Sequence, residues 1–204
     1  MKVGIVGHES SKFSPSGERQ AKDIIINIAV DGRLQMKPFK SIVAYPVLVS
    51  GRCPIATCYN CHNLQYAPSE ASISDPFICP QCGNLDAIRK GGIDIWAEQI
   101  WDIQGWSAFK EIKIPRQNEW NSPAGGYGFK ARNLDIAQVS DEVHVILATK
   151  YPDTYTGMKF DSCYHCDAMP ERWVGRAQQH PKSGACWTAI RAFNLGKPCI
   201  YHFV

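Results

Sequence analysis

Four cysteines in two Cys-x-x-Cys pairs constrain the fold of this 204-residue chain more than any other feature. Each pair, Cys58 with Cys61 and Cys79 with Cys82, can turn two thiolates toward one ion, and two such turns complete a tetrahedron around zinc. Residues 52–89, which carry both pairs, contain little apolar material for a core of their own. We therefore predict an inserted four-cysteine zinc ribbon over 52–89, whose metal supplies much of its folding free energy.

On either side of this insert, apolar strands alternate with segments of helical periodicity. Strands are predicted over 2–6, 42–49, 110–114, 143–148 and 198–204, and helices over about 17–30, 91–104, 133–139 and 184–195. This alternation is typical of parallel βαβ units. We expect an α/β fold in which residues 1–51 and 90–204 form a Rossmann-like, doubly wound, mainly parallel sheet of about five strands.

Composition limits the classes of function. A net charge of +3 is too small to favour nucleic acid as a partner, although it does not remove that alternative. No apolar run approaches the ~20 residues that a membrane helix needs, so we expect no membrane partner. The cysteine count is nine, an odd number, and no secretion signal precedes them, which favours metal binding over disulfides and a cytoplasmic location.

A second group of metal-binding residue types lies near the C-terminus. It consists of Cys163, Cys166, His180 and Cys186. These residues could assemble a second metal site, or they could be incidental thiols on a reduced surface loop. The spacing is compatible with both alternatives.

Polar loops follow several of the predicted strands, where doubly wound sheets bind their ligands. Three such loops, residues 7–14, residues 50–51 with 91–94, and residues 180–188, are expected to converge. Gly184 would let the backbone approach an anion, and the free N–H groups at the start of the last helix favour phosphate. The candidate ligand-binding residues are Gly7, His8, Glu9, Ser10, Lys12, Ser50, Gly51, Gly91, Gly92, Asp94, Arg132, Asn133, Ser183, Gly184, Ala185 and Thr188.

Several of these segments resemble the SLOG superfamily, which includes DNA-processing protein A (Smf) and the lonely-guy phosphoribohydrolases. The resemblance rests on Val-Gly-Ile-Val-Gly over 3–7, Leu-Val-Ser-Gly over 48–51, and Gly92-Ile93-Asp94 followed by Ala97. Ser-Gly-Ala-Cys-Trp-Thr-Ala over 183–189, with Gly-Lys-Pro over 196–198, is similar to the last phosphate loop and helix of the Smf branch. The resemblance implies a nucleotide-type, phosphate-bearing small molecule as ligand.

The hydrolase activity of that superfamily is not implied as clearly. The Pro-Gly-Gly-x-Gly-Thr-x-x-Glu loop of the lonely-guy enzymes is absent, and aligning its threonine on Thr188 puts Arg191 where the catalytic glutamate would fall. Glu9 or Asp94 could substitute as the catalytic acid, with Glu98 nearby in sequence. Three readings follow: a nucleotide-binding protein, a nucleotide N-glycosidic-bond hydrolase or transferase, and a nucleic-acid-binding protein related to Smf.

Three tryptophans suggest a surface for self-association. Trp96, Trp101 and Trp106 are spaced by five residues, which places them on different faces of a helix. We expect at least one to be exposed at the contact of a homodimer. Trp187, in the last helix, is either a core residue or a stacking platform.

Overall fold

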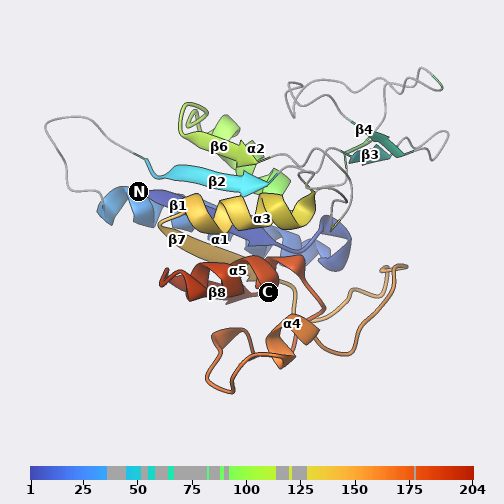
Figure 1. Cartoon of the computed structure of the whole chain (residues 1–204). Helices are drawn as coiled ribbons and strands as arrows, with labels where there is room; N and C mark the ends of the chain where they lie inside the picture. Colours follow the sequence, from blue (N-terminus) through green and yellow to red (C-terminus); the bar gives the residue numbers. More distant parts are fainter. Residues whose placement is uncertain are drawn as a thin grey trace, which may run out of the picture.

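The computed structural model describes residues 1–35, 45–51, 55–57, 64–66, 82, 88–89, 92–113, 120, 128–176 and 178–204. Its centre is a five-stranded sheet in which every described pairing is parallel (Figure 1). The strand order is β6-β2-β1-β7-β8. The strands are β1 (Lys2–Gly7), β2 (Val47–Gly51), β6 (Lys110–Lys113), β7 (Glu142–Leu147) and β8 (Cys199–Phe203). The α/β, doubly wound parallel sheet expected from the sequence is confirmed.

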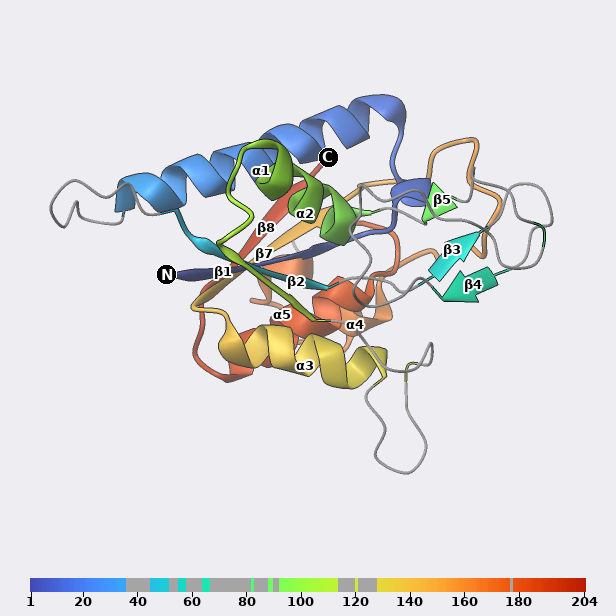
Figure 2. The same cartoon turned by 90° about the horizontal axis from the view of Figure 1, so that it is seen from above.

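Helices cover both faces of the sheet. α1 (Pro15–Gln35) and α2 (Ile93–Ile103) lie on one face, and α3 (Phe129–Val139) and α5 (Gly184–Asn194) on the other (Figure 2). The connection from β1 to β2 therefore crosses one face of the sheet through α1, and the connection from β7 to β8 crosses the opposite face through α5. The reversal of direction falls between β1 and β7, which pair from Val3↔Glu142 to Gly7↔Ile146. Such a switch point opens a crevice at the carboxyl ends of the two strands.

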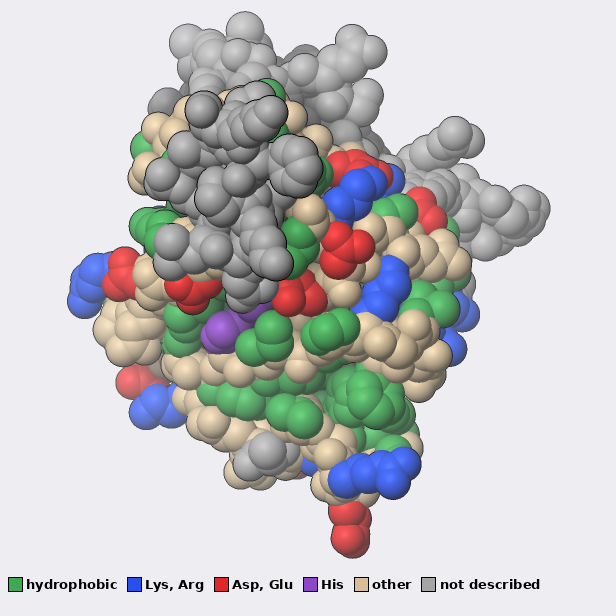
Figure 3. Space-filling model, turned by 90° about the vertical axis from the view of Figure 1, so that its left-hand side faces the viewer, with side chains coloured by type: hydrophobic (Ala, Val, Ile, Leu, Met, Phe, Trp, Pro, Cys, Tyr) green, Lys and Arg blue, Asp and Glu red, His purple; other side chains and the backbone are tan. Residues whose placement is uncertain are grey.

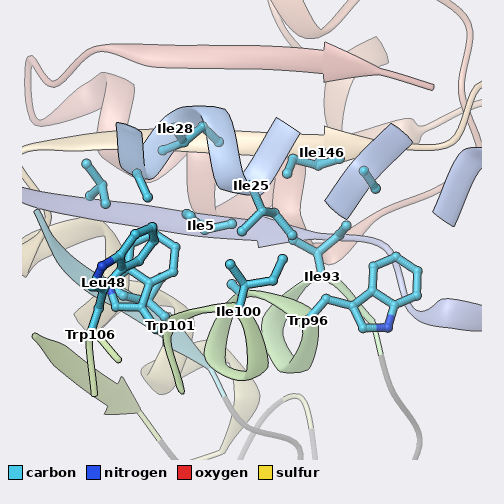
Figure 4. Packing of buried hydrophobic residues seen from close by; sticks show 14 of the residues in the cluster. Ile5, Ile25, Ile28, Leu48, Ile93, Trp96, Ile100, Trp101, Trp106 and Ile146 are labelled. Carbon is cyan, nitrogen blue, oxygen red and sulfur yellow. The ribbon is translucent and has the colours of Figure 1, made fainter. Parts of the chain in front are cut away.

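The core follows from the alternation of side chains along β1. Val3 and Ile5 point toward α1 and α2, whereas Val6 points toward α3 and α5. Figure 4 shows Ile25 of α1 and Ile100 of α2 meeting the first of these faces. The continuous apolar strands are typical of a parallel sheet that is buried on both faces.

Most predicted elements occur with shifted ends. α1 extends beyond 17–30 in both directions, and α3 begins at Phe129 rather than at Asn133. The predicted strand over 42–49 begins at Val47, and Pro46 lies before it because its nitrogen has no hydrogen to donate to the ladder. The part of that prediction over 42–44 lies outside the described residues.

The expectation that one of three tryptophans is exposed is wrong. Trp96, Trp101 and Trp106 are all buried, at 5%, 0% and 8% exposure. Helix α2 ends at Ile103, so Trp106 is not on the helix, and the chain folds back to bring its ring within 5.4 Å of that of Trp101. The tryptophans therefore give no support to a homodimer contact.

The insert over 52–89 has a small sheet of its own. β3 (Ile55–Thr57) pairs antiparallel with β4 (Leu64–Tyr66) and with β5 (Ile88–Arg89). Of the predicted ribbon ligands only Cys82 is described, and it is exposed. Cys58, Cys61 and Cys79 lie outside the described residues, so the four-cysteine zinc ribbon stays a prediction.

The surface mixes charges of both signs. On the side that lies at the left of Figure 1, hydrophobic side chains gather across the lower half, and acidic and basic side chains lie around them (Figure 3). No large area of one charge is visible on the described part of that side, in keeping with the small net charge. Within the described ranges, none of the helices has the length and apolar character needed to cross a bilayer.

Candidate functional site

A cavity of about 140 Å³ lies at the carboxyl end of β1, between the starts of α2, α3 and α5. It brings together residues from five separate parts of the chain. Many of them are candidates named from the sequence: Gly7, Asp94, Arg132, Asn133, Gly184, Ala185 and Thr188. Val6, Trp120 and Phe129 complete the described lining. The predicted convergence of strand-end loops thus has a physical cavity at its centre.

Arg132 is the cation of this cavity. Only 11% of its side chain is exposed, and its guanidinium lies over the ring of Phe129 at 5.3 Å. Nε and Nη2 both donate to Oδ1 of the buried Asn133, at 2.9 and 2.7 Å. This fork fixes the plane of the guanidinium, so the charge is oriented before a ligand arrives.

Asp94, in the first turn of α2, is the acid that faces Arg132. Its Oδ2 lies 3.4 Å from Nη1, a long contact for an ion pair. Burial raises the pKa of Asp94 to about 6, and the charge of Arg132 opposes that rise. Gly51 makes this pair possible, because a Cβ there would stand 2.5 Å from Nη1 of Arg132.

The start of α5 forms another wall of the cavity. Ser183 caps the helix by accepting from the N–H of Ala185 at 3.1 Å, and Thr188 is fully buried one turn on. Other N–H groups of a first helical turn have no partner within the helix and favour an anion. A Cβ added to Gly184 would lie 3.5 Å from the ring of Trp120, which is its nearest neighbour.

Trp120 and Phe129 were missed by the sequence reading. They place aromatic surface beside the cavity, and Trp120 also meets the half-buried Trp187 edge to face at 5.5 Å. Neither residue belongs to a periodic pattern or a motif, so nothing local in the sequence marks them. Trp187 itself packs under the guanidinium of Arg191 at 4.9 Å.

Other candidate residues support the cavity without lining it. Ser50 is buried and donates to the carbonyl of Ile5 at 3.0 Å. A Cβ on Gly92 would stand 2.8 Å from the carbonyl oxygen of His8, so this glycine permits a close backbone crossing. Lys12 donates to the carbonyl of Lys182 at 2.9 Å. Gly91 lies outside the described residues.

His8 joins three segments by two hydrogen bonds. Its Nδ1 accepts from the N–H of Ala148 at 3.0 Å, so Nε2 carries the hydrogen and donates to the carbonyl of Pro181 at 3.0 Å. The ring is only 2% exposed. Burial above all, together with the charge of Lys12, lowers the pKa of His8 to about 3. The imidazole is therefore a neutral link between β1, β7 and the segment before α5.

Glu9 and Ser10 line a second cavity of about 330 Å³. Its other walls come from Ser11 and from the loop after β7 that includes Thr154 and Tyr155. Gly7 at the end of β1 lines the first cavity, whereas the loop that follows β1 lines the second. The two acids named as catalytic candidates, Glu9 and Asp94, therefore line different cavities.

A cluster of three thiols and one imidazole lies beside the start of α5. Cys163 precedes α4 (Tyr164–Asp167), Cys166 lies in α4, His180 precedes α5, and Cys186 is in the first turn of α5. All four are buried, and their ligand atoms lie within 4.8 Å of one another. The sequence left a second metal site as one of two alternatives, and the structure shows a buried group that could hold a metal ion.

The imidazole of this cluster is aimed at the sulfurs. Nδ1 of His180 donates to the carbonyl of Pro181 at 2.8 Å, which leaves the lone pair of Nε2 free. Nε2 lies 3.6 Å from Sγ of Cys166 and 3.8 Å from Sγ of Cys186. A backbone carbonyl on the other ring nitrogen is the usual way to orient a metal-binding histidine.

The surroundings of the cluster favour thiolate at Cys163 and oppose it at Cys166 and Cys186. The thiols of Cys166 and Cys186 donate to Cys163 and hold its pKa far below the usual range, while the pKa of Cys166 rises to about 12. Trp173 Nε1 and the hydroxyl of Tyr201 are buried and find no nitrogen or oxygen acceptor among the described residues. The indole N–H of Trp173 instead faces Cys166 and lowers the pKa of that thiol.

Comparisons with protein-family models, with curated proteins and with solved structures found no match. The case for a function is therefore made from the geometry of the two cavities and the cluster.

The buried, neutral His8 makes a measurable prediction about pH. The unfolded chain binds a proton on this imidazole below about pH 6.5, whereas the folded protein does so only near pH 3, so stability falls as pH falls between these values. From pH 7.5 to 4.5 this single group should cost about 2.5 kcal/mol of unfolding free energy. Urea denaturation of wild type and His8→Gln at both pH values measures it, and we expect the smaller loss in the variant. Equal losses in the two proteins would contradict the assignment.

Proposed function

We propose that this protein binds a nucleotide or nucleotide-derived phosphate-bearing ligand at the carboxyl ends of its strands. The observation that carries the proposal is that one cavity is lined both by the oriented guanidinium of Arg132 and by the start of α5. A helix N-terminus and an arginine fork are the groups that proteins commonly direct at phosphate. The resemblance to the SLOG superfamily points to the same edge of the sheet.

The rest of the lining fits the rest of a nucleotide. The carboxylate of Asp94 can accept a hydrogen bond from a ribose hydroxyl, and Trp120 and Phe129 offer aromatic surface for a base. The small net charge favours this small-molecule role over nucleic acid, whose phosphates need many cations. A binding module is the role that these groups support best.

Removal of the Arg132 guanidinium should weaken anion binding. We expect the dissociation constant for sulfate, a dianion of phosphate's size, to rise at least tenfold in Arg132→Ala, with a smaller rise in Arg132→Lys because the planar fork is lost but the charge is kept. Isothermal titration with sulfate and with the common nucleoside monophosphates measures both. The exposed Arg19→Ala, which removes the same charge from α1, is the control and should bind as wild type does. Equal affinity in Arg132→Ala and Arg19→Ala would exclude this cavity as the site.

We further propose that the ion in the thiol–imidazole cluster is zinc. Three thiolates and one imidazole form a common tetrahedral zinc site, in which sulfurs 2.3 Å from the metal stand about 3.7 Å apart. Such a site leaves no open position, so its role is structural. Free thiolates need a reducing compartment, and the proposal therefore includes a cytoplasmic location.

Metal analysis tests the zinc proposal. With one ion in the predicted ribbon and one in the cluster, the purified protein should contain two zinc ions per chain. Cys163→Ser/Cys166→Ser should contain one fewer, whereas Cys199→Ser, which removes a thiol outside the cluster, should retain the wild-type number. Native mass spectrometry on the same samples gives the stoichiometry and would also reveal a co-purified ligand. An unchanged zinc content in the double variant would contradict the assignment.

One observation favours a catalytic alternative. Asp94 lines the cavity with its pKa raised to about 6, a property of groups that exchange protons near neutral pH. The reaction would be cleavage of a nucleotide N-glycosidic bond, with Asp94 as the acid–base group. Chromatographic detection of free base from nucleoside monophosphates tests it, and Asp94→Asn should abolish release while Glu9→Gln, in the other cavity, should not. No release of any base by the wild type would leave binding as the function.

A further inference from the structure

We infer that the thiol–imidazole cluster is the metal site that sets the anion-binding edge of the cavity, so that metal occupancy and ligand occupancy are thermodynamically coupled. This inference deepens the proposed function and rests on it. It depends on two connections between the cluster and the cavity. One runs along the chain through α5, and the other runs through hydrogen bonds to a single backbone carbonyl.

The first connection is α5 itself. Cys186 is a ligand of the cluster and lies in the first turn of the helix, between the cavity-lining Ala185 and Thr188. Cys186 and Ala192 are fully buried, so the helix cannot rotate without moving both its core face and its metal ligand. An ion that holds Cys186 therefore also holds the N–H groups that face the cavity.

The second connection is the carbonyl oxygen of Pro181. It accepts from Nδ1 of His180 at 2.8 Å and from Nε2 of His8 at 3.0 Å. His8 follows Gly7, whose backbone lines the cavity at the end of β1. One backbone oxygen thus ties a metal ligand to the strand end on the other side of the anion site.

The segment between β7 and α5 has little regular structure of its own. From Ala148 to Ser183 its described helices are the four-residue α4 and the short helix η3 (Val174–Arg176). Cys166 and Trp173 pack in the core beside α5, and a metal ion bound by Cys166 and Cys186 would add a crosslink between α4 and α5. Loss of the ion should free the start of α5 before it affects the sheet.

The test compares sulfate binding with and without the cluster metal. Zinc removal by a chelator, checked for retained fold by circular dichroism, should raise the sulfate dissociation constant at least tenfold, and zinc return should restore it. Linkage is reciprocal, so saturating sulfate must raise zinc affinity in chelator competition by the same factor. Cys58→Ser, which targets the predicted ribbon instead, is the matched control and should keep wild-type sulfate affinity.

A second variant covers the case in which the chelated protein unfolds. Cys163→Ser keeps three ligands and should bind zinc more weakly, so sulfate affinity can be followed against zinc concentration where the protein is folded. A sulfate affinity that does not change with zinc occupancy, in the folded chelated protein or in this variant, overturns the inference.

Failure of the proposed function would be visible separately. If the zinc-loaded wild type binds no sulfate, the anion site is wrong, and the coupling is read from hydrogen exchange alone. Zinc removal should then speed exchange of the amides of α5 from Thr188 onward, which donate within the helix, more than those of β1. Unchanged exchange at α5 overturns the inference in that case as well.

Discussion

The carbonyl oxygen of Pro181 accepts two buried imidazole N–H groups, and much of the functional edge depends on this arrangement. His8 reaches it from the end of β1, and His180 reaches it from the thiol–imidazole cluster. Each bond is made away from water, where a lost partner costs more than at the surface. The bond from His8 also fixes which nitrogen accepts from Ala148, so the ends of β1 and β7 and the entry to α5 are positioned together.

The positions of the cavity residues were predictable to the extent that parallel strands share an edge. Gly7, Asp94 and Gly184 each follow or open an element at the carboxyl end of the sheet, and the topology alone brings them together. The sequence could not distinguish a glycine that lines a cavity from a glycine that packs against another part of the backbone. Gly92 looks like Gly184 in sequence, yet it packs against the carbonyl of His8.

The remaining features that the sequence did not predict depend on tertiary contacts of single residues. Trp120 reaches the cavity because of where its loop lies, which no periodicity encodes. Helical spacing could not predict the exposure of Trp106, because this residue lies beyond the end of α2 at Ile103, where the chain folds its ring back onto Trp101. The cluster of Cys163, Cys166, His180 and Cys186 was recognisable as residue types, but only folding decides whether four such side chains meet.

The charges of the cavity favour a particular kind of anion. Among its described lining residues Arg132 is the one cation and Asp94 the one acid, so the local net charge is close to zero when both are ionised. A simple dianion gains from Arg132 and from the helix start but is repelled by Asp94. A phosphate ester that also carries a hydroxyl turns the same carboxylate into an acceptor, so the repulsion is offset by a charge-assisted hydrogen bond. The long 3.4 Å contact between Asp94 and Arg132 leaves the carboxylate of Asp94 able to accept from such a ligand. A sugar phosphate therefore satisfies the cavity more fully than a free phosphate ion does, which is the physical reason for expecting a nucleotide there.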